Sequence, residues 1–306
     1  MSRRRAPRDR DRLDRRYHLL FVLAVTGFGI AIAAWPLFYL VLQSYVPEWP
    51  GAMCIQGVIS IGQGSLGPAR HLPGLVALLE FTKPLLVFVA GTWLVLHLAG
   101  RRRDATRAAL PALLLFGCVS LVDGVAETTY LVTPKREYIA ETCCGATAPT
   151  AGPTSRAMMI GMAPGSKHLH TEMFFLVGIL AIAGASAALH SLRRNGHAGR
   201  WLTPAVATAV GSIPIGLVFL KTTAAPAFSG LPFHECVYCL FGSAPESLIG
   251  IGLFALGVFA LGWAASIFWL MPADDGNRAL TERLLRTARI GYAGALLMVT
   301  VRFVMP

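Results

Sequence analysis

Seven long apolar runs indicate that this chain crosses a lipid bilayer several times. About 20 apolar residues in a helix span a hydrocarbon core. The runs cover residues 18–43, 74–99, 108–132, 172–192, 201–221, 246–271 and 288–304. Because a spanning segment must satisfy its own backbone hydrogen bonds, each run is expected to form an α-helix. The sequence therefore predicts an all-α, polytopic helix bundle of about seven spans.

The charged residues support lipid as the solvent. Only 14% of the residues are charged, whereas soluble domains carry about 25%. The formal net charge of +11 would suit nucleic-acid binding, but its distribution argues against that. About 19 of the 27 Lys and Arg residues lie in the N-terminal tail, residues 1–17, or in the loops after the second, fourth and sixth runs. Basic clusters beside spans set membrane orientation, so no nucleic-acid partner is expected.

The same clusters predict how the chain is oriented. The positive-inside rule places the N-terminus in the cytoplasm and the C-terminus outside. Residues 45–73, 133–171 and 222–245 then form exoplasmic loops, and residues 1–306 form one integral membrane domain. We expect the bacterial cytoplasmic membrane as the location and the lipid bilayer as the first partner.

Five of the six cysteines fall in the expected exoplasmic loops. Cys54 is in the first loop, Cys143 and Cys144 are adjacent in the second, and Cys236 and Cys239 form a CxxC in the third. Disulfides persist in the periplasm or outside the cell. A CxxC can close a small reducible ring, and its thiols can lower one another's pKa. The same spacing is half of a zinc site, and a structural disulfide is a third interpretation.

The CxxC also carries a family resemblance. Residues 234–244, HECVYCLFGSA, lead into the sixth run. This segment resembles the active-site helix of bacterial vitamin K epoxide reductase homologues, over about 20 of the 306 residues. The resemblance implies that Cys236 and Cys239 reduce a quinone bound beside them and that a first-loop cysteine pair acts as a shuttle. That family has a four-helix core, whereas this chain has more spans. It also has Cys54 alone in the first loop, so Cys143 or Cys144 would take the missing role.

Four charged residues lie well inside the second and third apolar runs. Glu80 and Lys83 are in the second run, and Asp123 and Glu127 are in the third, at a spacing that places them on one helix face. Ionisable groups in a membrane are costly and pair with one another. We expect the four side chains to meet in the outer leaflet half. They would form either a salt-bridged network that joins two helices or a proton or cation path.

Three exoplasmic histidines suggest a metal site. His168, His170 and His234 could join the cysteines, because thiolate and imidazole suit copper or zinc. The alternative is that they are solvent-exposed loop histidines.

Three functional interpretations remain. No P-loop, G-x-S-x-G elbow or H-E-x-x-H helix is present, so nothing supports an ATPase or a hydrolase. The first interpretation is a membrane thiol–disulfide oxidoreductase that couples an exoplasmic thioredoxin-like protein to a membrane quinone. The second is a protein that binds or transports metal ions through outer Cys and His groups and buried carboxylates. The third is an accessory subunit with structural disulfides.

The orientation can be tested by thiol labelling. A membrane-impermeant thiol reagent, applied outside after reduction, is expected to label Cys54, Cys143 and Cys239. Mass spectrometry of the labelled peptides gives the result. Labelling of these residues from the cytoplasmic side alone would invert the orientation.

Overall fold

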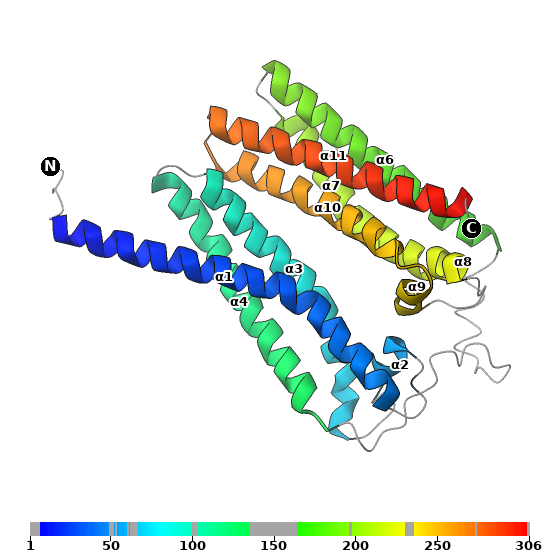
Figure 1. The fold of residues 1–306 in the computed structure, drawn as a ribbon. Helices are drawn as coiled ribbons and strands as arrows, with labels where there is room; N and C mark the ends of the chain where they lie inside the picture. The colour runs from blue at the N-terminus through cyan, green and yellow to red at the C-terminus, as the bar shows by residue number, and fades with distance from the viewer. Residues whose placement is uncertain are drawn as a thin grey trace. The chain divides into compact units, whose positions relative to one another are not determined.

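The computed structural model describes residues 7–48, 52, 54–59, 61, 67–99, 103–134, 164–195, 198–229, 236–272 and 274–304. The regular elements within these ranges are all helical, and seven helices are long and apolar enough to cross a membrane (Figure 1). The all-α, seven-span prediction is confirmed. Cys143, Cys144 and His234 lie outside the described residues, as does most of the second predicted exoplasmic loop.

The chain divides into two compact units. Unit 1 comprises residues up to Val41 together with Gly74–Val132. It contains α1 (Pro7–Tyr45) up to Val41, α3 (Leu72–Ala99) from Gly74, and α4 (Arg103–Val132). Apolar side chains from all three helices form its core, and they are Ala31, Leu86, Val89, Ala90, Phe116 and Val119.

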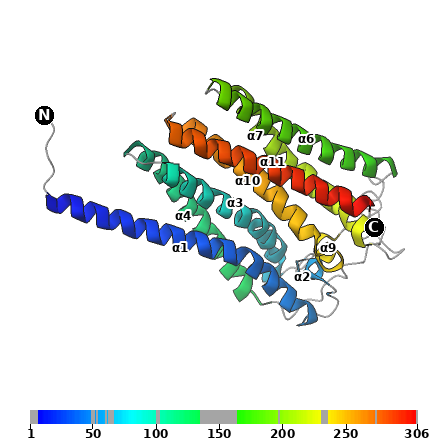
Figure 2. The ribbon, with the colours of Figure 1, turned by 45° about the horizontal axis from the view of Figure 1, so that its top comes forward.

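Unit 2 comprises Leu42–Pro73 and Thr133–Pro306, and four long helices form its body. These are α6 (Pro164–Asn195), α7 (Gly199–Phe219), α10 (Ser247–Leu270) and α11 (Asp275–Val304). In this unit α10 packs along α11, and α6 packs against α7 and α11 (Figure 2). Alanine and leucine dominate the buried contact surface. The small alanine side chains let helix backbones approach closely. In lipid, where the hydrophobic effect does not hold helices together, this close van der Waals packing does so instead.

A close backbone-to-backbone contact between α10 and α11 surrounds Gly291 of α11. A Cβ atom at this position would lie 2.7 Å from the Gly257 backbone nitrogen and 2.7 Å from the Leu253 carbonyl oxygen of α10. A Cβ at Gly257 would in turn lie 2.9 Å from Cδ2 of Tyr292. Because the obstructing atoms at Gly291 are backbone, no side-chain rotation can make room.

Basic residues at one end of unit 2 connect its helices. Glu282 on α11 forms ion pairs with Arg193 on α6 and with Arg286 on its own helix. Arg278 donates hydrogen bonds to the carbonyl oxygens of Leu192 (2.6 Å) and Arg193 (2.8 Å) in the last turns of α6. The last carbonyls of a helix lack partners within their own helix. Arg278, which the sequence marks as part of a basic cytoplasmic loop, therefore also satisfies the end of α6.

The last helix is longer than its apolar run suggests. The sequence indicates a short run over residues 288–304, but α11 begins at Asp275 and has 30 residues. At 1.5 Å per residue it is about 45 Å long, enough to span a bilayer. Near its C-terminal end, Arg302 Nε lies 3.4 Å from Glu246 Oε1. Arg302 therefore has a carboxylate partner close to the start of α10.

Short helices replace part of the predicted loops in unit 2. They are the 3₁₀ helices η1 (Val46–Glu48) and η2 (Pro68–His71), the π-helix η4 (Leu220–Ala224), and the α-helices α2 (Ile55–Ile59), α8 (Ala225–Ser229) and α9 (Val237–Ser243). Of these, α9 contacts α2, α8 and η4. This contact brings the first and third predicted exoplasmic loops together.

We predict that Gly291→Ala destabilises the protein by about 1–3 kcal/mol, because the added methyl group meets backbone atoms and must force α10 and α11 apart. Thermal unfolding in detergent measures the effect. The matched control is Gly252→Ala on α10, where an added Cβ would meet no atom of a neighbouring helix within 4 Å. The control should leave the melting temperature unchanged or raise it, since alanine has the higher helix propensity. Equal melting temperatures for the two variants would contradict the close contact.

Candidate functional site

Cys54 is held in place by the short helix that follows it. Its carbonyl oxygen accepts hydrogen bonds from the N–H groups of Gly57 (3.0 Å) and Val58 (3.4 Å), which begins α2. Val58 of this helix and Ile61 after it are almost fully buried. The Cys54 side chain is itself buried, with 8% of the residue exposed.

The CxxC opens α9. Cys236 occupies the N-cap position, and its carbonyl oxygen accepts the N–H of Leu240 at 3.2 Å. Cys239 follows within the first turn. The helix is anchored by Leu240, which is fully buried in an aromatic and alanine cluster with Phe174 of α6 and Phe219 of α7. The rings of Phe174 and Phe219 stack with centroids 4.3 Å apart and an interplanar angle of 8°.

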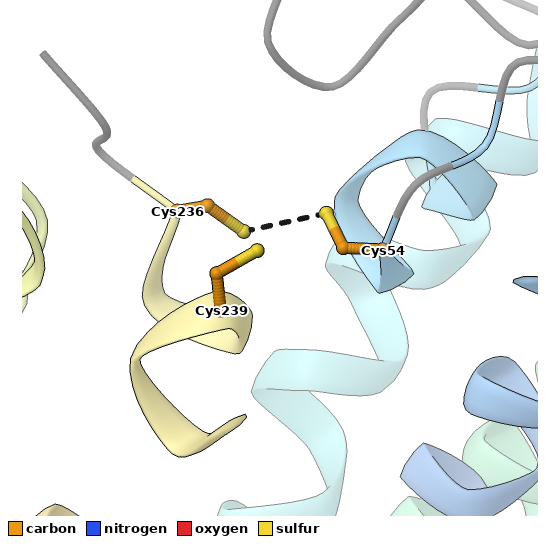
Figure 3. A group of neighbouring side chains, drawn as sticks. All are labelled: Cys54, Cys236 and Cys239. Atoms are coloured by element: carbon orange, nitrogen blue, oxygen red, sulfur yellow. Dashed lines mark hydrogen bonds between the residues drawn. The ribbon is translucent and has the colours of Figure 1, made fainter. Parts of the chain in front are cut away.

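Three cysteine sulfurs meet at this position. The Sγ atoms of Cys54 and Cys236 are 3.6 Å apart, although the residues are separated by 182 positions. The Sγ atoms of Cys54, Cys236 and Cys239 all lie within 4.8 Å of one another. Figure 3 shows the three side chains pointing toward one another, Cys54 from the segment before α2 and the other two from α9. We call this group the cysteine cluster.

The sulfurs of the cysteine cluster are in contact without being bonded. The 3.6 Å separation exceeds the S–S bond length of about 2.05 Å. Cys236 is buried like Cys54, and Cys239 is half-buried. Cys236 is therefore within a small side-chain movement of two different partners.

The environment of Cys239 favours its protonated form. Burial raises the pKa of the Cys239 thiol, and the neighbouring sulfurs of Cys236 and Cys54 raise it further. A thiol with a raised pKa stays protonated through neutral pH and forms thiolate only in more alkaline solution. Cys239 therefore holds a proton that must leave when its sulfur is oxidised.

Of the three predicted histidine ligands, His168 and His170 are not part of this group. His168 is exposed, and His170 Nδ1 lies 2.9 Å from Oγ1 of Thr222. Among the described residues, the group with metal-ligand spacing consists of the three cysteines. A mixed site would need His234, which lies outside the described residues.

Unit 1 contains the predicted ionisable cluster. Lys83 Nζ lies 3.1 Å from Asp123 Oδ2 and 2.7 Å from Glu127 Oε2. Lys83 and Asp123 are buried, and Glu127 is partly exposed. Glu80, one turn before Lys83 on α3, is half-buried. The structure thus brings Asp123 and Glu127 to the Lys83 ammonium group, as expected for three of the four residues.

Two further residues complete this cluster, and sequence reasoning missed both. Thr82 Oγ1 donates to Asp123 Oδ1 at 2.7 Å, so the Asp123 carboxylate accepts a donor on each oxygen. The Lys83 ammonium lies over the Phe38 ring, 5.1 Å from its centroid. A threonine beside an in-span lysine was a usable signal, whereas nothing local marked Phe38 among many apolar residues of α1.

No family model, curated protein or solved structure matches this chain. The resemblance to vitamin K epoxide reductase homologues therefore rests on the residues around the CxxC alone.

The charged cluster predicts a stability effect. Lys83→Met should lower the free energy of unfolding by about 3–5 kcal/mol, because it leaves buried carboxylates without their cation. Adding Asp123→Asn should recover part of the loss. Thermal unfolding in detergent measures both variants, with Arg283→Met as the control at an exposed position. An unchanged melting temperature for Lys83→Met would show that the ion pairs contribute nothing.

Proposed function

We propose that this protein is a membrane thiol–disulfide oxidoreductase whose reaction centre is the cysteine cluster. The observation that carries the proposal is the 3.6 Å contact between Cys54 and Cys236, beside Cys239. A structural disulfide needs two sulfurs. Disulfide exchange needs three, since one sulfur attacks, one is attacked and one leaves. The cluster supplies all three.

In the proposed mechanism Cys236 has the central place, which its contact with Cys54 supports. In the oxidised centre, Cys236 and Cys239 share a disulfide. The thiolate of Cys54 attacks the Cys236 sulfur, a Cys54–Cys236 bond forms, and the bond to Cys239 breaks. Cys239 leaves as a thiolate and takes up a proton, which its raised pKa favours. This exchange transfers the disulfide without changing the number of electrons in the centre.

The complete reaction transfers two electrons. An exoplasmic thioredoxin-like dithiol is oxidised to its disulfide and delivers two electrons and two protons to the cluster. The Cys236–Cys239 dithiol then passes both electrons and both protons to a membrane quinone, which becomes the quinol. The local resemblance around the CxxC supports this electron acceptor. The aromatic and alanine cluster around Leu240 offers the apolar surroundings that quinone-like ligands favour.

The proposed location follows from the chemistry. Thiol–disulfide exchange requires a compartment in which disulfides persist. The quinone requires a lipid phase, and the seven apolar helices fit an integral membrane protein. A bacterial cytoplasmic membrane with the cysteine cluster on its outer side meets both requirements.

A trapping experiment tests the role of Cys236. In Cys239→Ser the competing sulfur is absent, so we expect a stable Cys54–Cys236 disulfide after mild oxidation. Peptide mapping without reduction should find the two segments joined. The control is Cys118→Ser, because Cys118 lies on α4 outside the cluster. Failure to find the joined peptide in Cys239→Ser would remove Cys54 from the mechanism.

A quinone assay tests the reaction itself. The reduced full-length protein, given a soluble ubiquinone analogue, should regain the Cys236–Cys239 disulfide and consume one quinone per pair. Quinone absorbance and thiol counting measure the two halves of the reaction. Cys236→Ser should abolish consumption, and Cys118→Ser should preserve it.

The ease of reducing the Cys236–Cys239 pair separates the proposed function from a structural disulfide. A structural disulfide has a reduction potential below about −300 mV and resists a glutathione buffer. If the pair stays oxidised in the folded protein under millimolar dithiothreitol, or if the reduced pair consumes no quinone, the oxidoreductase function is wrong.

A further inference from the structure

The spacing of the cysteine cluster matches a three-coordinate sulfur site. Three sulfurs bonded to one central atom at about 2.3 Å, with bond angles near 100–120°, lie roughly 3.5–4.0 Å apart. Cys54 and Cys236 are already 3.6 Å apart, and Cys239 lies within 4.8 Å of both. Rotation of the half-buried Cys239 side chain would bring the third sulfur into this range.

The ligand set restricts the central atom to a soft element. Among the described residues this group holds sulfur alone, without a carboxylate or an imidazole. Thiolate ligands select thiophilic ions over hard cations such as magnesium or calcium.

Charge and burial then decide between soft elements. Three thiolates around a monovalent copper ion leave a net charge of −2, and around zinc they leave −1. Cys54 and Cys236 are each only 8% exposed, and an uncompensated charge in such a place is costly. Three thiolates around a trivalent centre leave no net charge. We propose that the reduced cysteine cluster binds one atom of trivalent arsenic or antimony, taken from the neutral hydroxide, through all three sulfurs.

The binding reaction is a ligand exchange. Three bonds form between the central atom and sulfur, and three bonds to hydroxyl oxygen break. The three thiol protons leave with the hydroxyl groups as three water molecules, and no oxidation state changes. Occupancy ties up all three sulfurs, so the bound form cannot carry out thiol–disulfide exchange. The inference needs a reduced cluster and is independent of the quinone proposed above.

The test uses full-length protein in which Cys118, Cys143 and Cys144 are replaced by serine, so that the cluster holds the remaining thiols. The protein is reduced with a phosphine, since a thiol reductant would itself bind arsenic. Titration with arsenite is expected to saturate at one arsenic per chain and to remove three titratable thiols. X-ray absorption should show three sulfur neighbours and no oxygen neighbour.

The matched control adds Cys54→Ser, which leaves the CxxC pair. Arsenite affinity should fall at least tenfold, because one of three bonds is lost. Phenylarsine oxide has only two exchangeable valences, so it should bind both proteins alike and report that the pair is intact. If the variant binds neither arsenite nor phenylarsine oxide, its fold has changed. The number of thiols lost per arsenic in the parent protein then decides whether two or three sulfurs bind.

Three results would overturn the inference. They are equal arsenite affinity with and without Cys54, two thiols lost per arsenic in the parent, and saturation by buffered monovalent copper under conditions where arsenite does not bind. None of them bears on the quinone assay, which uses arsenic-free protein. Failure here and failure of the oxidoreductase function are therefore distinguishable.

Discussion

Lipid as a solvent decides what holds this protein together. Water drives apolar side chains inward, but hydrocarbon does not, so helices in a bilayer must associate through close packing and polar contacts. Both devices are present. In unit 2, Gly291 and Gly257 let α11 and α10 approach until backbone meets backbone. In unit 1, Lys83 joins α3 to α4 through Asp123 and Glu127.

The cysteine cluster depends on short helices rather than on long ones. Segments of five and seven residues, α2 and α9, are too short to be stable alone. Each carries a buried apolar side chain, Val58 in α2 and Leu240 in α9. Because these two short helices have fixed positions in the fold, Cys54 lies beside Cys236 and Cys239 although it is far from them in sequence.

Sequence predicted the spans and missed the contacts between loops, for physical reasons. A span is a local property, because about 20 consecutive residues carry the whole signal. The Lys83–Asp123 pairing was also accessible, since a charge in a membrane needs a partner and few candidates exist. The start of α11 was missed because its first turns carry residues such as Arg278 and Glu282, which lower the hydropathy without interrupting the helix. The Cys54–Cys236 contact joins positions 182 residues apart, and no periodicity encodes that.

Chain entropy separates the two disulfides that Cys236 could form. A Cys236–Cys239 bond closes a loop of only two intervening residues, so it restrains the unfolded chain little. A Cys54–Cys236 bond closes a loop spanning 182 positions. By the loop-closure relation, the reduced entropy of the unfolded chain would then stabilise the folded state by about 5 kcal/mol at 25 °C. That difference would oppose exchange in a flexible chain. In the folded protein the sulfurs are already together, so the entropy of closing the long loop has been lost during folding. In the proposed exchange, moving the disulfide from one partner of Cys236 to the other would then depend on local chemistry alone, namely on which sulfur carries the proton and on how well each bond fits its geometry.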